Sequence, residues 1–287
     1  MGWGSYSVDD RATRATSLGY ATKSTYEIFT QRKINNAMNP HGIILREARD
    51  NADHPSSLAI IIALDVTGSM GSVPHHLIKD GLPLIMGDII QRATPDPQVL
   101  FLAIGDHECD DSPLQVGQFE SSDELLDKWL TDVYLEGGGG GNAGESYLLA
   151  WYFASHHTAT DCIEKRGQKG FLFTIGDEPT LKKVPGKVLK EIMGDGQYSD
   201  VPASVLLDEA REMYHVYHLH IRETGAGSRI ETINGWKQLM GDNLIVVDRH
   251  EDVARTIADI IKDNYSLGEK ASIVTTVKPT VANDEML

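Results

Sequence analysis

The stretch LAIIIALDVTGSMG, residues 58–71, decides the fold of this 287-residue chain. Its first part, LAIIIALD, is apolar on both alternating faces, which is typical of a central parallel strand covered on both sides. The strand runs into Asp65, Thr67 and Ser69, whose oxygen-bearing side chains alternate along a tight turn. Two interpretations follow from this stretch alone: a strand with a helix cap, or metal ligands delivered to the edge of a sheet.

Beyond this strand, short apolar runs alternate with amphipathic stretches, which is the pattern of βαβ units. The sequence therefore predicts an α/β fold: a doubly wound, mostly parallel central sheet with helices on both faces, as in Rossmann-like folds. We expect further strands within 98–108, 116–121, 169–179, 215–221 and 243–248. We expect helices within 73–93, 121–136, 145–158, 205–214, 230–240 and 250–265.

The chain divides into three parts. Residues 1–57 form a polar, partly helical N-terminal extension, which we expect to pack on the main domain through Ile43, Ile44 and Leu45. Residues 58–267 form the α/β domain, and residues 268–287 form a C-terminal tail without helical periodicity.

Composition limits the classes of partner. Acidic residues outnumber basic ones by 42 to 26, for a formal net charge of -16, so a nucleic-acid backbone is a poor partner. Only two cysteines occur, which excludes a disulfide framework and a cysteine-rich zinc module. The apolar runs are too short to span a bilayer, and the N-terminus lacks the apolar core of a signal peptide. These features predict a cytoplasmic protein without membrane or nucleic-acid partners.

Three predicted strands end in similar chemistry. Asp65, Asp106 and Asp177 each follow a buried strand, and in a doubly wound sheet ligands bind beyond the carboxyl ends of the strands. A glycine-rich loop, residues 137–141, leads into Asn142, Glu145 and Ser146. Carboxylates, hydroxyls and an amide without thiols form a hard-oxygen set that suits Mg²⁺, Mn²⁺ or Ca²⁺. Asp106 is open to three roles: an anchor behind the ligands, a ligand of an extra ion, or a loop acid.

The segment DVTGSM resembles the Asp-x-Ser-x-Ser element of von Willebrand factor A (VWA) domains, with Thr67 in place of the first serine. In that family this element opens the metal-ion-dependent adhesion site. The resemblance implies that Thr67 and Ser69 bind the ion directly, and that Asp65 and Asp177 hold it through water.

The second loop departs from the family pattern, in which a threonine supplies the ligand. Here the candidates are Asn142 first, then Glu145, then Ser146. The segments GDHECDD and GGGNAGE are similar to loops in the VWA domains of atypical alpha-kinases, and the overall motif style resembles bacterial intracellular VWA proteins. No kinase motif accompanies them, so the resemblance does not imply phosphotransfer.

The resemblance implies a non-enzymatic, divalent-cation-dependent protein-binding module of a bacterial or phage protein, whose metal site an Asp or Glu of a partner completes. It also implies action with an AAA+ ATPase or within a larger assembly. Two alternatives stay open: a metal-dependent phosphoesterase using Asp65, Asp106 and Asp177, or a subunit of a homo-oligomeric assembly. His218 and His220 share one strand face at a spacing found in zinc sites, but without a third ligand we expect packed or surface histidines.

Overall fold

A six-stranded sheet forms the centre of the computed structural model, which describes residues 6–20, 22–77, 85–87, 89, 96–136, 142 and 144–275. The sheet order is β10-β9-β6-β2-β3-β4, and every pairing is parallel except that of β3 with β4. Its strands are β2 (Leu58–Asp65), β3 (Pro97–Ile104), β4 (Leu114–Val116), β6 (Gly170–Gly176), β9 (Tyr214–Ile221) and β10 (Leu244–Val247).

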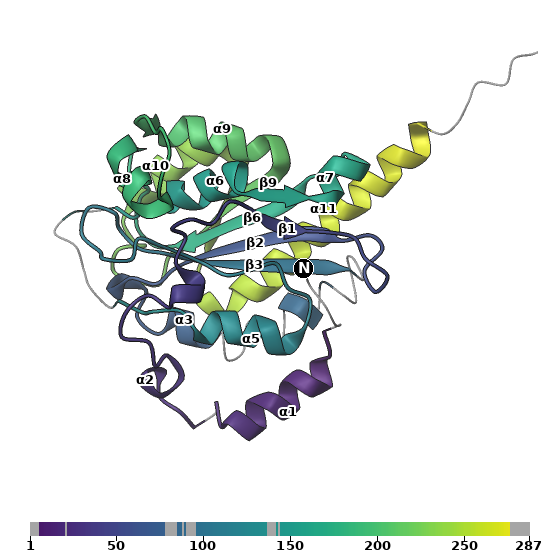
Figure 1. Cartoon of the computed structure of the whole chain (residues 1–287), viewed down its shortest axis with the longest axis horizontal. Coiled ribbons are helices and arrows are strands. Elements are labelled where there is room, and N and C mark those ends of the chain that lie inside the picture. Colours follow the sequence, from purple (N-terminus) through teal and green to yellow (C-terminus); the bar gives the residue numbers. More distant parts are fainter. Residues whose placement is uncertain are drawn as a thin grey trace, which may run out of the picture.

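Helices cover both faces of this sheet, so the predicted doubly wound α/β class is confirmed (Figure 1). One face carries α3 (Val73–His76), α5 (Asp123–Thr131) and α11 (Val253–Thr275). The other face carries α6 (Tyr147–His156), α7 (Asp161–Arg166), α8 (Gly186–Met193), α9 (Ala203–Met213) and α10 (Ile230–Met240). Short elements complete the chain: η1 (Asn36–Met38), η2 (Gly68–Met70), η4 (Gly241–Asn243), η5 (His250–Asp252), β7 (Lys183–Val184) and β8 (Val201–Pro202).

The alternation of side chains in β2 explains why the strand is apolar throughout. Leu58, Ile60, Ile62 and Leu64 enter the core beneath α5 and α11, whereas the intervening alanines and Ile61 enter the core beneath α6 and α9. Because both faces are buried, each residue of the strand loses contact with water. The strand is thus fixed at the centre of the sheet, and its last residue lies at the sheet's edge.

Element boundaries differ from the prediction in several places. The strand predicted within 116–121 is β4, Leu114–Val116, which overlaps that range at Val116 alone. Of the helix predicted over 73–93, Val73–His76 and residues 77, 85–87 and 89 are helical; the remaining positions lie outside the described residues. Helix α11 continues to Thr275, so the prediction of a non-helical tail from residue 268 was wrong for residues 268–275.

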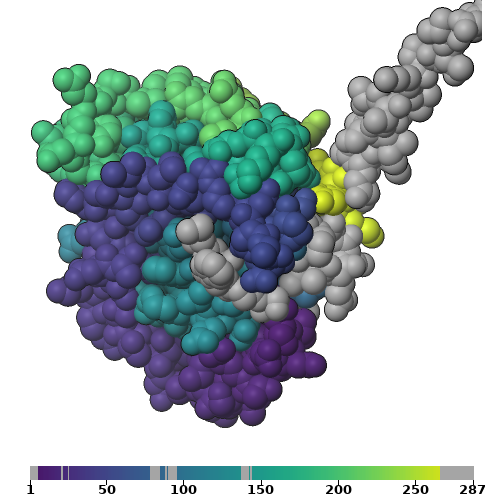
Figure 2. All heavy atoms as spheres, turned by 45° about the vertical axis from the view of Figure 1, so that its right-hand side comes forward, coloured from purple at the N-terminus to yellow at the C-terminus, as the bar shows by residue number. Residues whose placement is uncertain are grey.

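The N-terminal extension, residues 6–57, lies across one side of the main domain (Figure 2). Helix α1 (Val8–Leu18) packs on α5 through a buried ion pair between Arg11 and Asp127, at 3.2 Å. The Tyr20 hydroxyl also donates a hydrogen bond to Asp127. α2 (Thr25–Ile28) and the residue after it supply Ile28 and Phe29 to the core. The extension therefore packs on the domain.

The residues expected to hold the extension do not all do so. Ile44 is 86% exposed and Leu45 41% exposed, so the prediction was wrong for both, while Ile43 is partly buried against the core. The sequence directly after them contributes instead. β1 (Arg46–Ala48) pairs in parallel with β5 (Thr158–Thr160), which places the polar side chains that follow β1 against α7.

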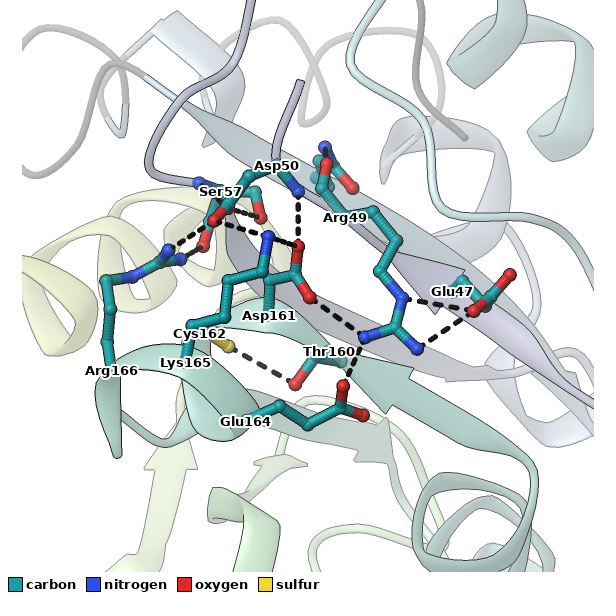
Figure 3. A network of polar contacts seen from close by, with 11 residues as sticks. Glu47, Arg49, Asp50, Ser57, Thr160, Asp161, Cys162, Glu164, Lys165 and Arg166 are labelled. Carbon is teal, nitrogen blue, oxygen red and sulfur yellow. Dashed lines mark hydrogen bonds and ion pairs between the residues drawn. The ribbon is translucent and has the colours of Figure 1, made fainter.

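A polar network fastens this segment to α7 (Figure 3). Arg49 contacts Asp161 at 2.9 Å and also contacts Glu47 and Glu164. Asp50 accepts hydrogen bonds from Arg166 at 2.7 Å and from the backbone and hydroxyl of Ser57. Burial alone would raise the pKa of Asp50, but the bonds from Arg166 and Ser57 outweigh it and lower the pKa to about 2.

We expect Asp50→Asn to destabilise the protein at neutral pH and to matter little at pH 2. The lowered pKa means that ionised Asp50 contributes stability above its unfolded-state pKa of about 3.9, and that this contribution is lost as the pH falls towards 2. Urea unfolding at pH 6 and at pH 2 measures the difference between wild type and variant. Asp53→Asn, at an exposed position three residues away, is the matched control and should show no such pH dependence. A difference that stays constant with pH would contradict the assignment.

Candidate metal site

The predicted ligand loops meet where the strand order reverses. From β2 the chain proceeds to β3 on one side and later to β6, β9 and β10 on the other, so the switch lies between β2 and β6. Asp65 is the last residue of β2, and Asp177 directly follows β6. Ligands of doubly wound folds bind at this place, beyond the carboxyl ends of the strands.

Hydrogen bonds connect four of the predicted residues in a chain of oxygen atoms. Oδ1 of Asp65 accepts from the backbone N of Thr67 at 2.9 Å and from its hydroxyl at 2.6 Å. The Thr67 and Ser69 hydroxyl oxygens lie 3.1 Å apart, and Ser69 donates to Oδ1 of Asp177 at 2.9 Å. The structure thus brings Asp65, Thr67, Ser69 and Asp177 together, although more than 100 residues separate the last two in sequence.

Two carboxyl groups of this site are fully buried without a basic partner. Asp65 and Asp177 are each 0% exposed, and among the ion pairs of the described residues none involves either of them. Burial raises the pKa of Asp65, and the nearby charge of Asp177 raises it further. A buried carboxylate is stable only when paired, hydrogen-bonded or bound to a metal. Neutral donors alone bond both carboxyl groups in the described residues, so a bound cation would supply a positive charge that these donors do not.

Two further residues hold these carboxylates from behind. The Tyr147 hydroxyl donates to Oδ2 of Asp65 at 2.6 Å, and the Thr224 hydroxyl donates to Oδ2 of Asp177 at 2.6 Å. We did not predict either residue, although both positions carried a signal. Tyr147 begins the helix that directly follows Glu145 and Ser146, and Thr224 follows the end of β9 at the same edge of the sheet.

Of the three second-loop candidates, Glu145 is the one with a buried side-chain oxygen that has no partner among the described residues and with an electrostatic interaction with Asp65. Glu145 is 8% exposed, its Oε2 is buried without a hydrogen-bond partner among the described residues, and burial and the charge of Asp65 raise its pKa. Asn142 is exposed and donates instead to Glu108, at 2.7 Å. The Ser146 hydroxyl bonds the backbone N and Nδ1 of His107. The predicted preference for Asn142 finds no contact in the structure that brings it to Asp65.

Asp106 forms its described hydrogen bonds within the loop that follows β3. Its Oδ1 accepts from the backbone of Glu108 at 2.8 Å, and its backbone N donates to Asp110 at 2.7 Å. Oδ2 of Asp106 is buried without a hydrogen-bond partner among the described residues, and the charge of Asp106 contributes to the raised pKa of Glu145. Asp106 thus adds negative potential beside Glu145, but no described hydrogen bond joins it to Asp65 or Asp177.

His218 and His220 pack beneath the site, as expected. The His218 ring stacks on Trp236 at a centroid distance of 3.5 Å, and its Nδ1 lies 2.9 Å from the hydroxyl of Thr174. His220 bonds the backbone carbonyl of Gly227 at 2.8 Å. Burial lowers the pKa of both imidazoles, so they stay neutral at physiological pH and supply no charge to the buried carboxylates.

The donor set fits a hard divalent cation. Adjacent oxygen ligands around octahedral Mg²⁺, at about 2.1 Å from the ion, lie about 3.0 Å apart. The hydroxyl oxygens of Thr67 and Ser69 are 3.1 Å apart, so both can bind one ion with little movement. Asp65 and Asp177 each accept a hydrogen bond from one of these hydroxyls, at 2.6 and 2.9 Å, so both carboxylates lie beside the position where the hydroxyls would bind an ion.

Comparisons with known proteins stop at the level of fold. No family model and no curated protein matches the chain. In the described part of the chain, every helix is too short or too polar to cross a membrane. Two structures of the pilus adhesin SpaC from Lactobacillus rhamnosus GG are similar to this chain over 77% of its length. The open conformation has a TM-score of 0.47 and 11% sequence identity. A second crystal structure has a TM-score of 0.46 and 14% sequence identity. The similar region covers 31–32% of the adhesin's length, and neither likeness bears on what this chain does.

Proposed function

We propose that this protein is a non-enzymatic, divalent-cation-dependent protein-binding module of the VWA type, in which Asp65, Thr67, Ser69 and Asp177 hold Mg²⁺ or Mn²⁺. One observation carries the proposal: two fully buried carboxylates, joined by two hydroxyls, face each other at the switch point without a basic partner among the described residues. A cation is the group that balances such a charge.

The arrangement supports binding rather than simple structural capping. If neutral hydroxyls are direct ligands and the aspartates act through water, the ion keeps part of its positive charge. The bound ion then supplies an open coordination position for a carboxylate of a partner protein. Cooperation with an AAA+ ATPase, assembly into a larger complex and a bacterial or phage origin belong to this proposal through the VWA resemblance alone.

Glu145 is the residue we assign to the second loop. Its unpartnered Oε2 and its electrostatic interaction with Asp65 support a role at the same ion. A glutamate in place of the threonine of the family pattern would lower the net charge of the loaded site. The protein would then bind an acidic partner less tightly than a module with a threonine there, which favours reversible assembly.

The open coordination position can be measured without knowing the partner. Mn²⁺ bound to the protein should enhance water-proton relaxation, and added acetate should reduce the enhancement by displacing coordinated water. Mg²⁺ should compete with Mn²⁺, and Ser69→Ala should weaken Mn²⁺ binding by at least about tenfold, because it removes a direct ligand. Ser17→Ala, at an exposed serine of α1, is the matched control. Mn²⁺ binding that survives Ser69→Ala unchanged would overturn the proposal.

The enzymatic alternative has its own readout. Hydrolysis of a generic phosphomonoester by wild type, lost in Ser69→Ala and in EDTA, would favour the phosphoesterase. Capture of an unmodified partner that requires Mg²⁺ and that the same variant abolishes would favour the binding module.

A further inference from the structure

We infer that Glu223, His250 and Glu251 form a second metal site, for a transition-metal ion such as Zn²⁺, on the outer wall of the protein next to the site described above. One candidate ligand atom of each residue lies within 4.8 Å of the others. Within the described residues this is the one such group of three His, Cys, Asp or Glu side chains.

The ligand atoms converge because two strand ends meet there. Glu223 follows β9, and His250 and Glu251 follow β10, which pairs in parallel with β9. Nδ1 of His250 faces both carboxylates, at 2.5 Å from Oε1 of Glu223 and 3.6 Å from Oε2 of Glu251. The backbone N of His250 also donates to Glu223 at 2.8 Å, which fixes the imidazole relative to that carboxylate.

The geometry and the charges suit a metal ion at Nδ1 of His250. Arg249 donates to Oε1 of Glu251 at 2.7 Å, so the oxygen of Glu251 that lies nearer to His250 is Oε2. The side chain of His250 is only 13% exposed, and its Nε2 is buried without a hydrogen-bond partner among the described residues. The imidazole is thus held in one orientation by its packing and by Glu223, which lowers the ordering cost of binding a metal.

A nitrogen ligand distinguishes this site from the Asp65 site. One imidazole with two carboxylates suits Zn²⁺, Co²⁺ or Ni²⁺, whereas an all-oxygen set suits Mg²⁺. The ring of His76, in α3, packs against that of His250 at a centroid distance of 4.6 Å and helps to hold the imidazole in place. Glu223 directly precedes Thr224, whose hydroxyl donates to Asp177, so the loop after β9 contributes a residue to each of the two sites.

The test uses Zn²⁺ itself, titrated calorimetrically into the full-length protein in saturating Mg²⁺, which occupies the hard-oxygen site. We expect one Zn²⁺ per chain, and roughly 10- to 100-fold weaker binding in His250→Gln and in Glu223→Gln. His156→Gln is the matched control, because His156 is an exposed histidine paired with one glutamate, Glu209, at 3.0 Å. Glu251→Gln should weaken binding as well, and because the side chain of Glu251 is half exposed, this substitution leaves the packing of the core unchanged.

Two results separate this inference from the proposed function. Asp177→Asn should leave Zn²⁺ binding unchanged, even where it removes Mg²⁺ binding, because Asp177 offers no ligand to the second site. Visible absorption of Co²⁺ at the site should disappear in His250→Gln and persist in Asp177→Asn. Zn²⁺ binding that His250→Gln and Glu251→Gln leave unchanged, or that Asp177→Asn abolishes, would overturn the inference.

Discussion

Asp177→Asn should make the metal-free protein more stable than wild type and should abolish its stabilisation by Mg²⁺. In the metal-free protein the variant removes one of two buried like charges, and it keeps the size and shape of the side chain. The two groups that bond Asp177, Ser69 and Thr224, are hydroxyls, which can accept as well as donate. The asparagine amide can therefore be accommodated without an unpaired donor.

The expected sizes of the two effects are large enough to separate. At a Mg²⁺ concentration about 100 times the dissociation constant, binding stabilises the folded state by about 2.7 kcal/mol. For a domain of this size that corresponds to a rise in Tm of roughly 5–10 °C. Wild type should show this rise and Asp177→Asn should not, while the Tm of the variant in EDTA exceeds that of wild type. Thermal unfolding with and without Mg²⁺ measures both.

The same repulsion predicts a pH dependence in EDTA. Because the pKa of Asp65 is raised in the folded state, the folded state retains a proton that the unfolded state has lost, and stability falls as the pH rises from about 4 towards the raised pKa. Asp177→Asn should flatten this fall, since Asp177 is one of its causes. Asp242→Asn, at a fully exposed carboxylate, changes the net charge equally. It should neither remove the stabilisation by Mg²⁺ nor flatten the fall in stability with pH. Equal Mg²⁺ stabilisation of wild type and Asp177→Asn would contradict the assignment of Asp177 to the ion.

The fold was predictable from sequence because its strands are buried on both faces. β2, β3 and β6 have every residue buried, so each reads as a mostly apolar run, which is typical of a covered parallel strand. β1 was not predictable in this way. Its three residues, Arg46 to Ala48, are held by pairing with β5 and by the contacts of Arg49 and Asp50 with α7, which lie more than 100 residues away in sequence.

The candidate site was predictable where one rule applied, namely that ligands follow the carboxyl ends of parallel strands. This rule identified Asp65 and Asp177 and extends to Thr224, which we overlooked because β9 ends in no acidic cluster. The choice among Asn142, Glu145 and Ser146 depended on tertiary contacts instead. Ser146 is occupied by His107 and Asn142 by Glu108, and no property of the local sequence reveals which hydroxyl or amide already has a partner.

Gly176→Ala should destabilise the protein strongly and disable the metal site at the same time. Gly176 is the last residue of β6, and a Cβ built on it would overlap the hydroxyl oxygen of Tyr147 and lie 2.6 Å from Cζ of that ring. Tyr147 is fully buried beside His218 and Trp236, at centroid distances of 5.2 and 5.4 Å, so its ring has little room to move away. Overpacking of this kind typically costs about 1–3 kcal/mol, and more where the neighbours cannot relax.

The effect on the site follows from the hydrogen bond that Tyr147 makes. A displaced Tyr147 no longer donates to Asp65, whose second oxygen then remains buried without its partner, so Mg²⁺ stabilisation should fall together with the Tm. Gly235→Ala is the control: Gly235 lies within α10, a Cβ there meets no atom within 4 Å, and alanine favours a helix over glycine by about 1 kcal/mol. Tyr147→Phe separates the two losses, because it removes the hydrogen bond to Asp65 and keeps the ring. If Gly176→Ala is as stable as wild type, the position of the Tyr147 ring does not require a glycine at the end of β6. A Gly176→Ala protein that is destabilised but keeps the full Mg²⁺ response would show that Tyr147 supports the core and not the ion.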